Sequence, residues 1–468
     1  MKYLHSIKND ELEINTKQYF FNLLFILKTL YFIFFASLLV FARPVLGISF
    51  FGYRIGELAI VLAFLISMLF LILPEKMQSL FFKNRLMLIS HKLIILSFFV
   101  LAFVSNSSFL SSYTYKVSSY IWTISFFYLG FLLIANFKVE KFNPLMFMSA
   151  IPLVTYIIST GNYPNFVMQF FIDYSDKFQF LKPSDIFLGY IVTNFVNRYI
   201  FKSKKSSIAY LVISTALMAP LLLLGSRGSF LGMTLFFLFE LFNYRYELIK
   251  NWKNTLLIFL IGLIVLIFST SRIDFENNSN ITLGEDFTEY LGENISPLGL
   301  IDSLREFENK KDTVRVFFSF YWHYGRLEST DSTTNWRLDI WQDIFYGMVE
   351  DGRIIKGYGY KEVFPQMLDP TAPGRLGRDG LNEHIHNYFM NIFARGGILQ
   401  LLFFLMLHYS FIKYWKEQNG DRLILNFMIP CLIVSSLDVT MEGVHFPLIY
   451  YSFLFFFLNI STKVNKII

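Results

Sequence analysis

Three short polar motifs carry the residues of this 468-residue chain whose side chains are best suited to chemistry. They are GSRG at 225–228, NWRLDIW at 335–341 and HIHNYF at 384–389. The first two supply Arg227 and Arg337, and a guanidinium group binds phosphate oxygens in a bidentate manner. The third supplies His386, whose imidazole can take a proton near neutral pH. If these residues converge, they predict a site that binds one anionic substrate beside a group able to take a proton.

Each arginine also has a structural interpretation. Arg227 lies at the outer, N-terminal end of a predicted membrane helix, where free backbone amides attract an anion. An arginine at such a position can instead reach the lipid headgroups. Positive charge is disfavoured on this side of a membrane, which favours the anion-binding interpretation. Arg337 could equally stack on a neighbouring indole, with Asp339 and Asp343 as ion-pair partners.

His386 has three interpretations: a proton acceptor, a hydrogen-bonded histidine at a helix end, or a metal ligand. A metal site would also draw on Asp379, Glu383 and His384. However, two histidines separated by one residue point to different faces of a helix, and no HExxH motif or cysteine set supports a metal. The proton acceptor is narrowly favoured over the structural histidine, and we expect neither a metal nor another cofactor.

The composition places these motifs in a membrane protein. The chain is 54% hydrophobic and 19% aromatic, and only 16% of its residues are charged. The net charge of +6 is therefore interpreted through its distribution among the loops, and no nucleic-acid partner is expected. The single cysteine, Cys431, excludes an internal disulfide.

Apolar segments of near membrane-spanning length recur along the chain. Their cores lie at 20–42, 56–73, 87–104, 119–136, 145–160, 186–201, 208–225, 229–243, 255–271, 397–414, 423–437 and 445–460. We therefore predict an all-α integral membrane protein with about 12 transmembrane helices. One large loop that carries short helices separates helices 9 and 10. The predicted organisation is helices 1–9 in residues 1–271, the loop domain in 272–384, and helices 10–12 in 385–468.

The distribution of positive charge predicts the orientation. Lysine and arginine are concentrated in the alternate loops that include both termini, and such loops face the cytoplasm. Both termini are then cytoplasmic, and the 272–384 loop lies on the opposite, outer side with all three motifs.

The outer loop contains one clear amphipathic pattern. Trp336, Ile340, Ile344 and Met348 recur every four residues, which predicts a helix over 333–349. Asp331, Ser332 and Thr333 offer N-caps for this helix. A second helix is expected to start near Asn382 and to run into the tenth membrane segment.

At these residues the chain resembles the membrane-bound O-antigen ligase and polymerase superfamily from about residue 20 to 460. The resemblance rests on the twelve-segment architecture and on four motifs. They are SRG at 226–228, NWRLDIW at 335–341, GYGY at 357–360 and HNYFMNIFARGG at 386–397. His386 and Asn387 are followed by nine residues and Gly397, as in the ligase pattern. Gln400 stands where that pattern has a small residue or tyrosine, which weakens a ligase relative to a polymerase.

The resemblance implies a bacterial inner-membrane glycosyltransferase whose active site faces the periplasm. The donor would be a glycan on undecaprenyl pyrophosphate, and the acceptor a sugar hydroxyl of lipid A core or of a second lipid-linked glycan. His386 would be the catalytic base, and Arg227 and Arg337 would bind the pyrophosphate without a metal. Asn387 would orient the sugar or the imidazole. Arg395 would be a third phosphate ligand or a buried structural ion.

Other functions stay open. A polymerase would join lipid-linked repeat units, and related proteins also glycosylate proteins. A transporter or flippase would require charged residues at the membrane midplane and related halves, and the sequence shows few such charges and no internal repeat. A structural partner in polysaccharide export would not require arginines beneath the loop.

Overall fold

A computed structural model describes most of the chain. The described residues are 26, 29–74, 78, 84–136, 144–160, 163–176, 181–201, 203–272, 319–370, 372, 375–376 and 383–464. Asp379, one of the residues considered for a metal, lies outside them, as does most of the first half of the predicted outer loop.

The described residues are mostly helical. An apolar helix at Thr29–Phe41 is followed by α2 (Arg43–Gly47), α3 (Ile55–Ile72), α5 (Arg85–Val104), α6 (Ser112–Val117), α7 (Ser119–Trp122), η1 (Thr123–Ser125), α8 (Phe126–Asn136), η2 (Pro144–Ala150), α9 (Ile151–Ser159), α10 (Asn165–Tyr174), α11 (Pro183–Ile200), α12 (Lys204–Gly225), α13 (Arg227–Lys250), α14 (Trp252–Ser271), α17 (Ser332–Glu350), η4 (Pro365–Met367), α18 (Tyr388–Asn419), α19 (Ile424–Leu437) and α20 (His445–Val464). Two short antiparallel hairpins that the sequence did not predict pair β1 (Ser49–Phe50) with β2 (Tyr53–Arg54) and β3 (Phe320–His323) with β4 (Arg326–Ser329).

Five helices in the described part of the chain are long and apolar enough to cross a membrane. They are α3, α5, α12, α14 and α18. Shorter apolar helices coincide with further predicted segments, at Thr29–Phe41, Phe147–Ser159, Ile424–Leu437 and His445–Ile460. The chain is therefore a multi-pass, mostly helical membrane protein. The number twelve, the orientation and the position of the loop between helices 9 and 10 stay predictions.

The predicted segment 119–136 is not one continuous helix. The chain changes from α7 to α8 through the 3₁₀ turn η1. Near this turn the Ser67 and Ser125 hydroxyls are hydrogen-bonded to each other inside the protein. A 3₁₀ segment inside a helix tightens the backbone and redirects it, so this segment is shorter and more irregular than its composition suggests.

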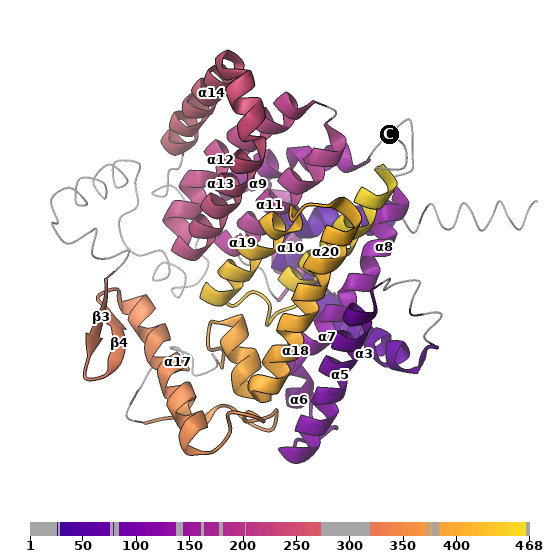
Figure 1. Ribbon diagram of the computed structural model, residues 1–468, viewed down its shortest axis with the longest axis vertical. Coiled ribbons are helices and arrows are strands. Elements are labelled where there is room, and N and C mark those ends of the chain that lie inside the picture. The colour runs from indigo at the N-terminus through magenta and orange to yellow at the C-terminus, as the bar shows by residue number, and fades with distance from the viewer. Residues whose placement is uncertain are drawn as a thin grey trace, which may run out of the picture.

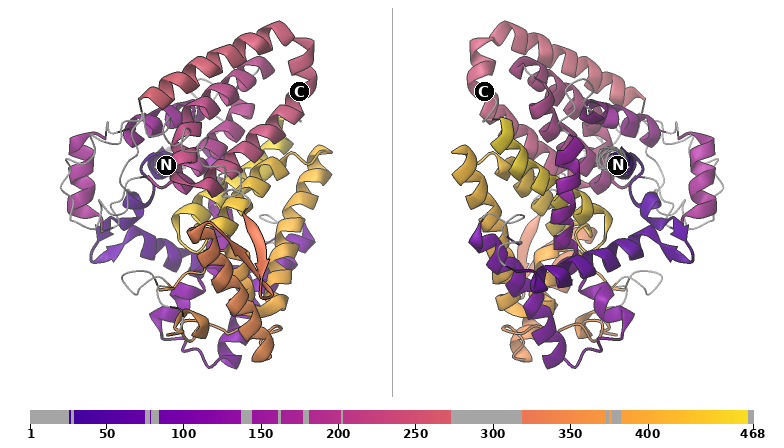
Figure 2. Two further views of the ribbon diagram at one scale, coloured as in Figure 1. Left: turned by 90° about the vertical axis from the view of Figure 1, so that its left-hand side faces the viewer. Right: turned by 90° about the vertical axis from the view of Figure 1, so that its right-hand side faces the viewer.

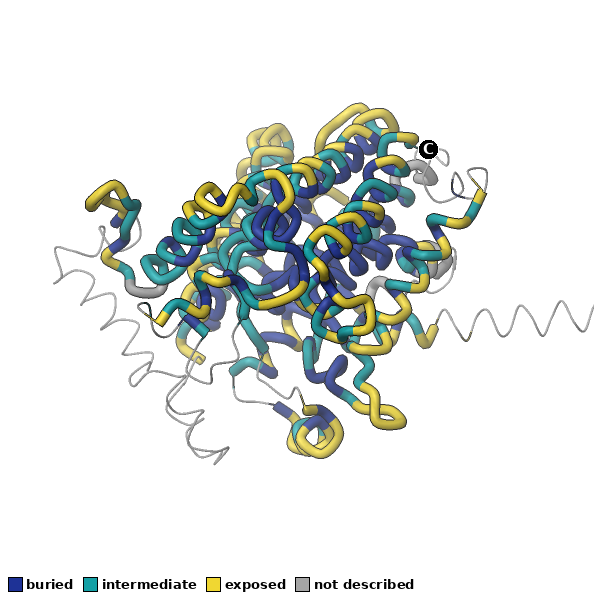
Figure 3. Tube along the Cα trace, turned by 90° about the horizontal axis from the view of Figure 1, so that it is seen from below, coloured by how far each residue is buried: buried dark blue, intermediate teal, exposed yellow. Residues whose placement is uncertain are grey.

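Aromatic side chains fill the core between the helices. α20 packs on α8, α18 on α5, and α12 on both α13 and α14. Trp122, Tyr190, Tyr450 and Phe98 are among the largest fully buried side chains. Figure 3 shows this buried interior surrounded by helices whose outer turns are exposed. Exposed apolar surface on helices such as α14, where few residues of the apolar window are buried, is expected of a protein that contacts lipid.

The predicted loop helix is confirmed as α17. Asp331 is its N-cap and accepts a hydrogen bond from the Thr334 amide at 2.9 Å. Ile340, Ile344 and Met348 are fully buried in a second, smaller hydrophobic cluster. Other members of this cluster come from the 364–367 segment and from the start of α18. The periodicity therefore marked the face that docks α17 onto α18. Figures 1 and 2 show α17 beside the start of α18, at the end of the molecule opposite α14.

The second loop helix begins later than expected. α18 starts at Tyr388, and residues 383–387 are not helical. His386 has a φ of 54°, in the left-handed region that non-glycine residues seldom adopt. Asn387 then caps α18, because its side chain accepts a hydrogen bond from the Met390 amide at 2.9 Å. The left-handed residue and the cap fix where the helix begins, and hydrophobic periodicity does not report either of them.

Candidate functional site

Arg227 is the first residue of α13. The preceding Ser226 caps the helix, and its hydroxyl accepts a hydrogen bond from the Ser229 amide at 3.3 Å. The Arg227 side chain is 48% exposed, so its guanidinium lies at the protein surface beside the free amides of the helix end. This arrangement is the one expected of an anion-binding position.

Asp331 links Arg227 to the loop helix. Arg227 Nη1 lies 3.0 Å from Asp331 Oδ1, and Asp331 is also the N-cap of α17. Partial burial raises the pKa of this carboxyl, but hydrogen bonds from Thr334 and the charge of Arg227 outweigh that effect and hold the pKa below its usual value. Asp331 is therefore ionised near neutral pH, and it attaches the start of α17 to the start of α13.

The second turn of α17 lies against His386. The Trp336 and His386 rings meet edge to face, with centroids 5.1 Å apart. One turn later, Trp341 Nε1 donates a hydrogen bond to the Ile385 carbonyl at 2.6 Å. These contacts hold the segment before α18 against α17. The start of α17 therefore joins the start of α13 to the residues that precede α18.

Arg337 lies in this same turn of α17 and acts on His386 through its charge. Burial lowers the pKa of His386 to about 4, and the positive charge of Arg337 contributes further in the same direction. Asp438 opposes both effects. His386 is therefore neutral near pH 7 and able to accept a proton. Burial and the charge of Lys116 lower the pKa of the neighbouring His384 to about 4 as well.

The acids expected to pair with Arg337 bind other arginines. Asp343 forms ion pairs with Arg326, at 2.6 Å, and with Arg375, and Asp339 lies 3.4 Å from Arg326. These pairs join the β3–β4 hairpin and the 375–376 segment to one side of α17. The carboxylates near Arg337 in sequence thus serve to attach the loop to α17.

Arg395 lies in a different environment from Arg227. It is 2% exposed, and its Nη1 donates hydrogen bonds to the carbonyls of Gly359, at 3.1 Å, and Glu362, at 2.7 Å. Its guanidinium carbon lies 3.9 Å from the centre of the Phe364 ring. These are the contacts of a buried structural residue that holds the segment after GYGY against α18.

The GYGY and ARGG motifs form one backbone junction. α18 is broken at Gly397, where φ is 69° and ψ is −175°. The amides of Tyr358 and Gly359 donate to the carbonyls of Ala394 and Arg395 at 2.8 and 2.9 Å, and the Ile398 amide donates to the Ile354 carbonyl at 2.9 Å. The loop therefore supplies the hydrogen bonds that the helix loses at the break, as buried backbone groups require.

Gln400 lies inside a polar network next to this junction. Its Oε1 accepts a hydrogen bond from the Tyr120 hydroxyl at 2.7 Å, and its Nε2 donates to Ser97 at 2.8 Å and to Tyr360 at 2.9 Å. The residue that departs from the ligase pattern is thus fully buried and well hydrogen-bonded, and it helps to hold the GYGY segment in place.

Glu442 is a buried acid that the sequence did not indicate. This residue follows α19 and is 8% exposed, and burial raises the pKa of its carboxyl to about 8. The motif VTMEGVH around it carries no recognisable chemical signature, so only the fold reveals its burial. Within the described residues, no group of three or more histidine, cysteine, aspartate or glutamate side chains is arranged to hold a metal ion.

Comparison with known proteins identifies a family for this region. A family model described as O-antigen ligase matches residues 210–405, a range that contains Arg227, Arg337, His386 and the whole of α17. No curated protein matches the chain.

Proposed function

Because the chain belongs to the O-antigen ligase superfamily, as the match over residues 210–405 shows, we propose that it is a membrane glycosyltransferase of the ligase type. It moves a glycan from undecaprenyl pyrophosphate to a sugar hydroxyl of lipid A core at the periplasmic face of the inner membrane. One observation supports this proposal: the first two turns of α17 contact Arg227 through Asp331 and His386 through Trp336, and they carry Arg337.

The reaction needs charge neutralisation and a proton acceptor. The acceptor hydroxyl attacks the anomeric carbon of the donor, and the bond from that carbon to the pyrophosphate oxygen breaks. Negative charge then grows on the pyrophosphate, where Arg227 and Arg337 stabilise it through bidentate hydrogen bonds. The hydroxyl proton passes to the neutral imidazole of His386 as the new bond forms. Two guanidinium groups supply the charge that a divalent metal provides in other transferases, so the proposed reaction is metal-independent.

The position of Arg337 couples donor binding to the base. The charge of Arg337 is one of the causes that keep the pKa of His386 low. A pyrophosphate bound to Arg337 would offset that charge and raise the pKa of His386 towards neutrality, where a general base is most effective. The histidine would then become a better proton acceptor when donor is present.

A polymerase that joins lipid-linked repeat units is the second candidate. The observation that favours it is Gln400, which departs from the ligase pattern and is fully buried beside Tyr360. Donor chemistry and site residues are the same in both activities, and the acceptor differs.

A transporter or flippase is less well supported. Glu240, a buried acid of the membrane region, is bound by Arg198 and accepts a hydrogen bond from Asn426 at 2.8 Å. An acid with two such partners stabilises helix packing and is poorly placed to bind a transported ion.

The test is a transfer assay on the purified full-length protein in lipid nanodiscs. Arg227→Ala, Arg337→Ala and His386→Ala are each expected to lower transfer from the lipid-linked donor by about a hundredfold or more, the usual cost of one transition-state contact. Arg245→Ala is the matched control, since this exposed arginine lies near the far end of α13. Full activity in both site arginine variants would refute the proposal.

Two further arms decide the acceptor and the metal. Supplying lipid A core or a second lipid-linked glycan distinguishes a ligase from a polymerase. Chelation with EDTA is expected to leave the rate unchanged, and a chelator-sensitive rate would overturn the metal-independent mechanism.

A further inference from the structure

The β3–β4 hairpin of the outer loop presents an aromatic surface beside the start of α17. Four large rings on β3 and the turn that follows it are exposed: Phe320, Tyr321, Trp322 and Tyr324. Trp322 is 72% exposed and Tyr324 is 93% exposed. Figure 1 shows the hairpin at the edge of the molecule, next to α17. Exposed apolar rings gathered on one short segment mark an interaction surface, and the proposed reaction does not use them.

The hairpin is held on α17 by its second strand. The Leu327 amide donates a hydrogen bond to Gln342 Oε1 at 2.8 Å, and Gln342 Nε2 donates back to the Leu327 carbonyl at 2.9 Å. The Ser329 amide donates to Asn335 Oδ1 at 2.9 Å. β4 therefore lies between α17 and β3, and β3 presents its side chains away from the helix. A surface that is already ordered loses little conformational entropy when a ligand binds.

The two faces of the hairpin differ in character. Side chains alternate along a strand, so Phe320 and Trp322 lie on one face and His323 lies on the other. The cross-strand partner of Trp322 is Leu327, which makes the first face apolar. On the second face, His323 Nδ1 lies 3.1 Å from Glu328 Oε1. The hairpin thus combines a row of rings with polar groups on the same short ribbon.

The charged groups of the hairpin already have partners. Arg326 Nη1 lies 2.6 Å from Asp343 Oδ1, Arg326 Nη2 lies 3.4 Å from Asp339, and His323 is paired with Glu328. A ligand held here by its charge would have to displace one of these partners. The same charged groups disfavour insertion of the hairpin into lipid, because they would lose their contact with water. These observations favour a water-soluble ligand group that binds through apolar contacts and hydrogen bonds.

A sugar chain has the chemistry that these rings require. A sugar ring has an apolar face of C–H groups and an edge of hydroxyl groups. The face of an aromatic ring is electron-rich and attracts the weakly positive C–H groups. The Trp322 N–H and the Tyr324 hydroxyl can form hydrogen bonds with sugar hydroxyls at the same time. Stacking on an exposed ring therefore suits a glycan.

The hairpin is continuous with the junction at Arg227. β4 ends at Ser329, whose hydroxyl accepts a hydrogen bond from the Asp331 amide at 3.2 Å. Asp331 is the residue that pairs with Arg227. In the proposed reaction Arg227 binds the pyrophosphate of the donor, so the sugar attached to that pyrophosphate lies beside Arg227. The sugars that follow it can extend over the hairpin.

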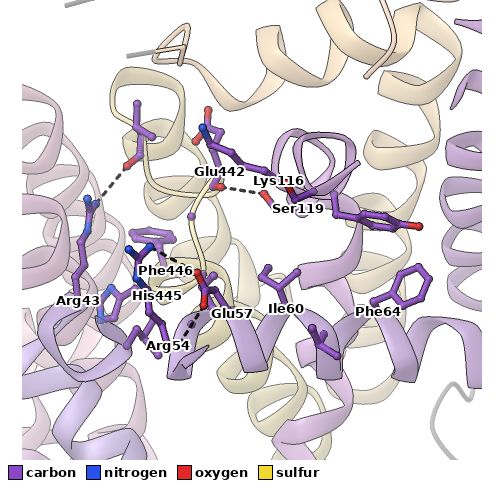
Figure 4. A pocket seen from close by; sticks show the side chains of 18 of the residues that line it. Arg43, Arg54, Glu57, Ile60, Phe64, Lys116, Ser119, Glu442, His445 and Phe446 are labelled. Carbon is purple, nitrogen blue, oxygen red and sulfur yellow. Dashed lines mark hydrogen bonds and ion pairs between the residues drawn. The ribbon is translucent and has the colours of Figure 1, made fainter. Parts of the chain in front are cut away.

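The hairpin is separate from the cavity shown in Figure 4. That cavity, of about 1160 Å³, lies between α2, α3, α6, α7 and the residues that lead into α20. No residue of β3 or β4 is among the described residues that line it. Two of its positive side chains are paired with acids, Arg43 with Asp185 and Lys116 with Glu383. Substitutions on the hairpin are therefore expected to leave this cavity unchanged.

We propose that the exposed rings of the β3–β4 hairpin bind the glycan of the lipid-linked donor, at sugars beyond the one attached to the pyrophosphate. Trp322 and Tyr324 stack on these sugars while Arg227 holds the pyrophosphate. This inference rests on the proposed transferase function. It makes the hairpin a specificity element, because a donor with a long glycan gains contacts that a donor with a single sugar cannot make.

The experiment compares two donors in steady-state kinetics of the full-length protein in nanodiscs. Both carry undecaprenyl pyrophosphate, one with a long glycan and one with a single sugar. Trp322→Ala is expected to raise the KM of the long donor about tenfold more than that of the single-sugar donor, the effect of removing one well-placed aromatic contact. Trp322→Phe keeps a ring and is expected to recover most of this loss. Trp252→Ala, which changes an exposed tryptophan at the start of α14, is the control.

Equal changes in the KM of the two donors in Trp322→Ala, or no change in either, would overturn the proposal. A larger effect on the KM of the glycan acceptor than on that of the long donor would also overturn it. Nanodiscs made with brominated lipid test the membrane as the occupant. Stronger fluorescence quenching of the wild type than of Trp322→Phe would place the indole in the bilayer and would refute glycan binding at the hairpin.

A binding measurement separates this proposal from the transferase function. The free glycan, released from the donor by hydrolysis, is titrated into the wild type and into Trp322→Ala by calorimetry. We expect the Kd to rise about tenfold in the variant, and an unchanged Kd contradicts the proposal. Glycan binding through Trp322 without any transfer would refute the transferase function and leave the hairpin site intact. Transfer that depends on Arg227 but not on Trp322 would give the reverse result.

Discussion

Arg227 was expected to bind phosphate, and Arg395 was expected either to bind phosphate or to be a buried structural ion. The structure places the two arginines in opposite surroundings. Arg227 is about half exposed and pairs with a single carboxylate at the start of α17. Arg395 is buried and donates to backbone carbonyls beneath an aromatic ring. A carboxylate partner at the surface can be exchanged for a phosphate, because both accept the same hydrogen bonds. Buried carbonyls cannot be left unpaired without a cost, so they keep their arginine.

The two regions differ in whether their polar groups can change hydrogen-bond partners. The junction at the start of α17 holds groups that can change partners. The junction at the break in α18 holds groups that are fixed, and it positions the loop from which α17 extends. Substitutions should therefore divide into those that affect transfer and those that affect folding.

Arg395→Met gives the largest expected effect on folding. It leaves the carbonyls of Gly359 and Glu362 without their donor, and each unsatisfied buried group costs about 1–3 kcal/mol. We expect the free energy of unfolding to fall by about 3 kcal/mol, measured by denaturation in detergent, with transfer per folded molecule within about threefold of wild type.

Arg227→Met is the matched comparison for that variant. A surface ion pair contributes about 0–1 kcal/mol, so its unfolding free energy should hardly change while its transfer collapses. If Arg395→Met stayed stable but lost a hundredfold in transfer, Arg395 would be a phosphate ligand. The two arginines would then not differ in role.

Gly397→Ala tests the break in α18 directly. Its φ of 69° with ψ of −175° belongs to a region that is essentially confined to glycine, and an added Cβ would lie 2.0 Å from the Ile355 carbonyl oxygen. We expect unfolding to become easier by about 2 kcal/mol, the middle of the range for such strain. Gly420→Ala is the control: it also has a positive φ, of 76°, but nothing lies within 4 Å of an added Cβ. Equal losses of unfolding free energy in the two variants would show that the packing of the loop against Gly397 contributes nothing to stability.

The pH profile of transfer tests His386 as the proposed base. A group with a pKa of about 4 is neutral from pH 5.5 upwards, so kcat/KM for the donor, which reports the enzyme without bound donor, should change less than twofold between pH 7.5 and 5.5 and should fall only as the pH approaches 4. A histidine with the ordinary pKa of about 6.5 would be roughly 90% protonated at pH 5.5 and would lose about tenfold. A tenfold loss of kcat/KM in this interval, absent from His386→Gln, would contradict the low pKa of His386. A loss confined to kcat is the result that the proposed effect of bound donor on this pKa predicts.

The sequence was most informative where periodicity and capping act locally. The four-residue spacing from Trp336 and the acid at Asp331 predicted α17 almost to its ends. A helix that buries one face carries apolar residues at the helical spacing of that face. The association of Arg227, Arg337 and His386 was expected from their common side of the membrane. The contacts that achieve it could not be deduced, because Arg227 meets Asp331 through an ion pair between elements far apart in the chain.

The sequence was least informative where the backbone departs from regular structure. The left-handed His386, the break at Gly397 and the pairing of GYGY with ARGG depend on tertiary hydrogen bonds that have no local pattern. The same holds for Glu442, whose burial depends on the fold and has no local sequence pattern. For Arg395, both interpretations were available from the sequence, and its buried carbonyl partners favour the structural one.

Asp331→Asn gives the smallest expected effect, and it tests whether Arg227 can exchange its Asp331 partner for the donor. Asparagine is as good an N-cap as aspartate, so α17 should keep its start, and loss of the ion pair should cost less than about 1 kcal/mol of stability. The substitution also releases Arg227 from its carboxylate, so the donor KM should fall by a few-fold. Asp331→Ala removes the cap as well, and it should cost about 1 kcal/mol more than Asp331→Asn in the same denaturation experiment. If Asp331→Asn instead raised the donor KM as much as Arg227→Ala does, the carboxylate would be holding Arg227 in place for the donor. The exposed junction would then be as fixed as the buried one.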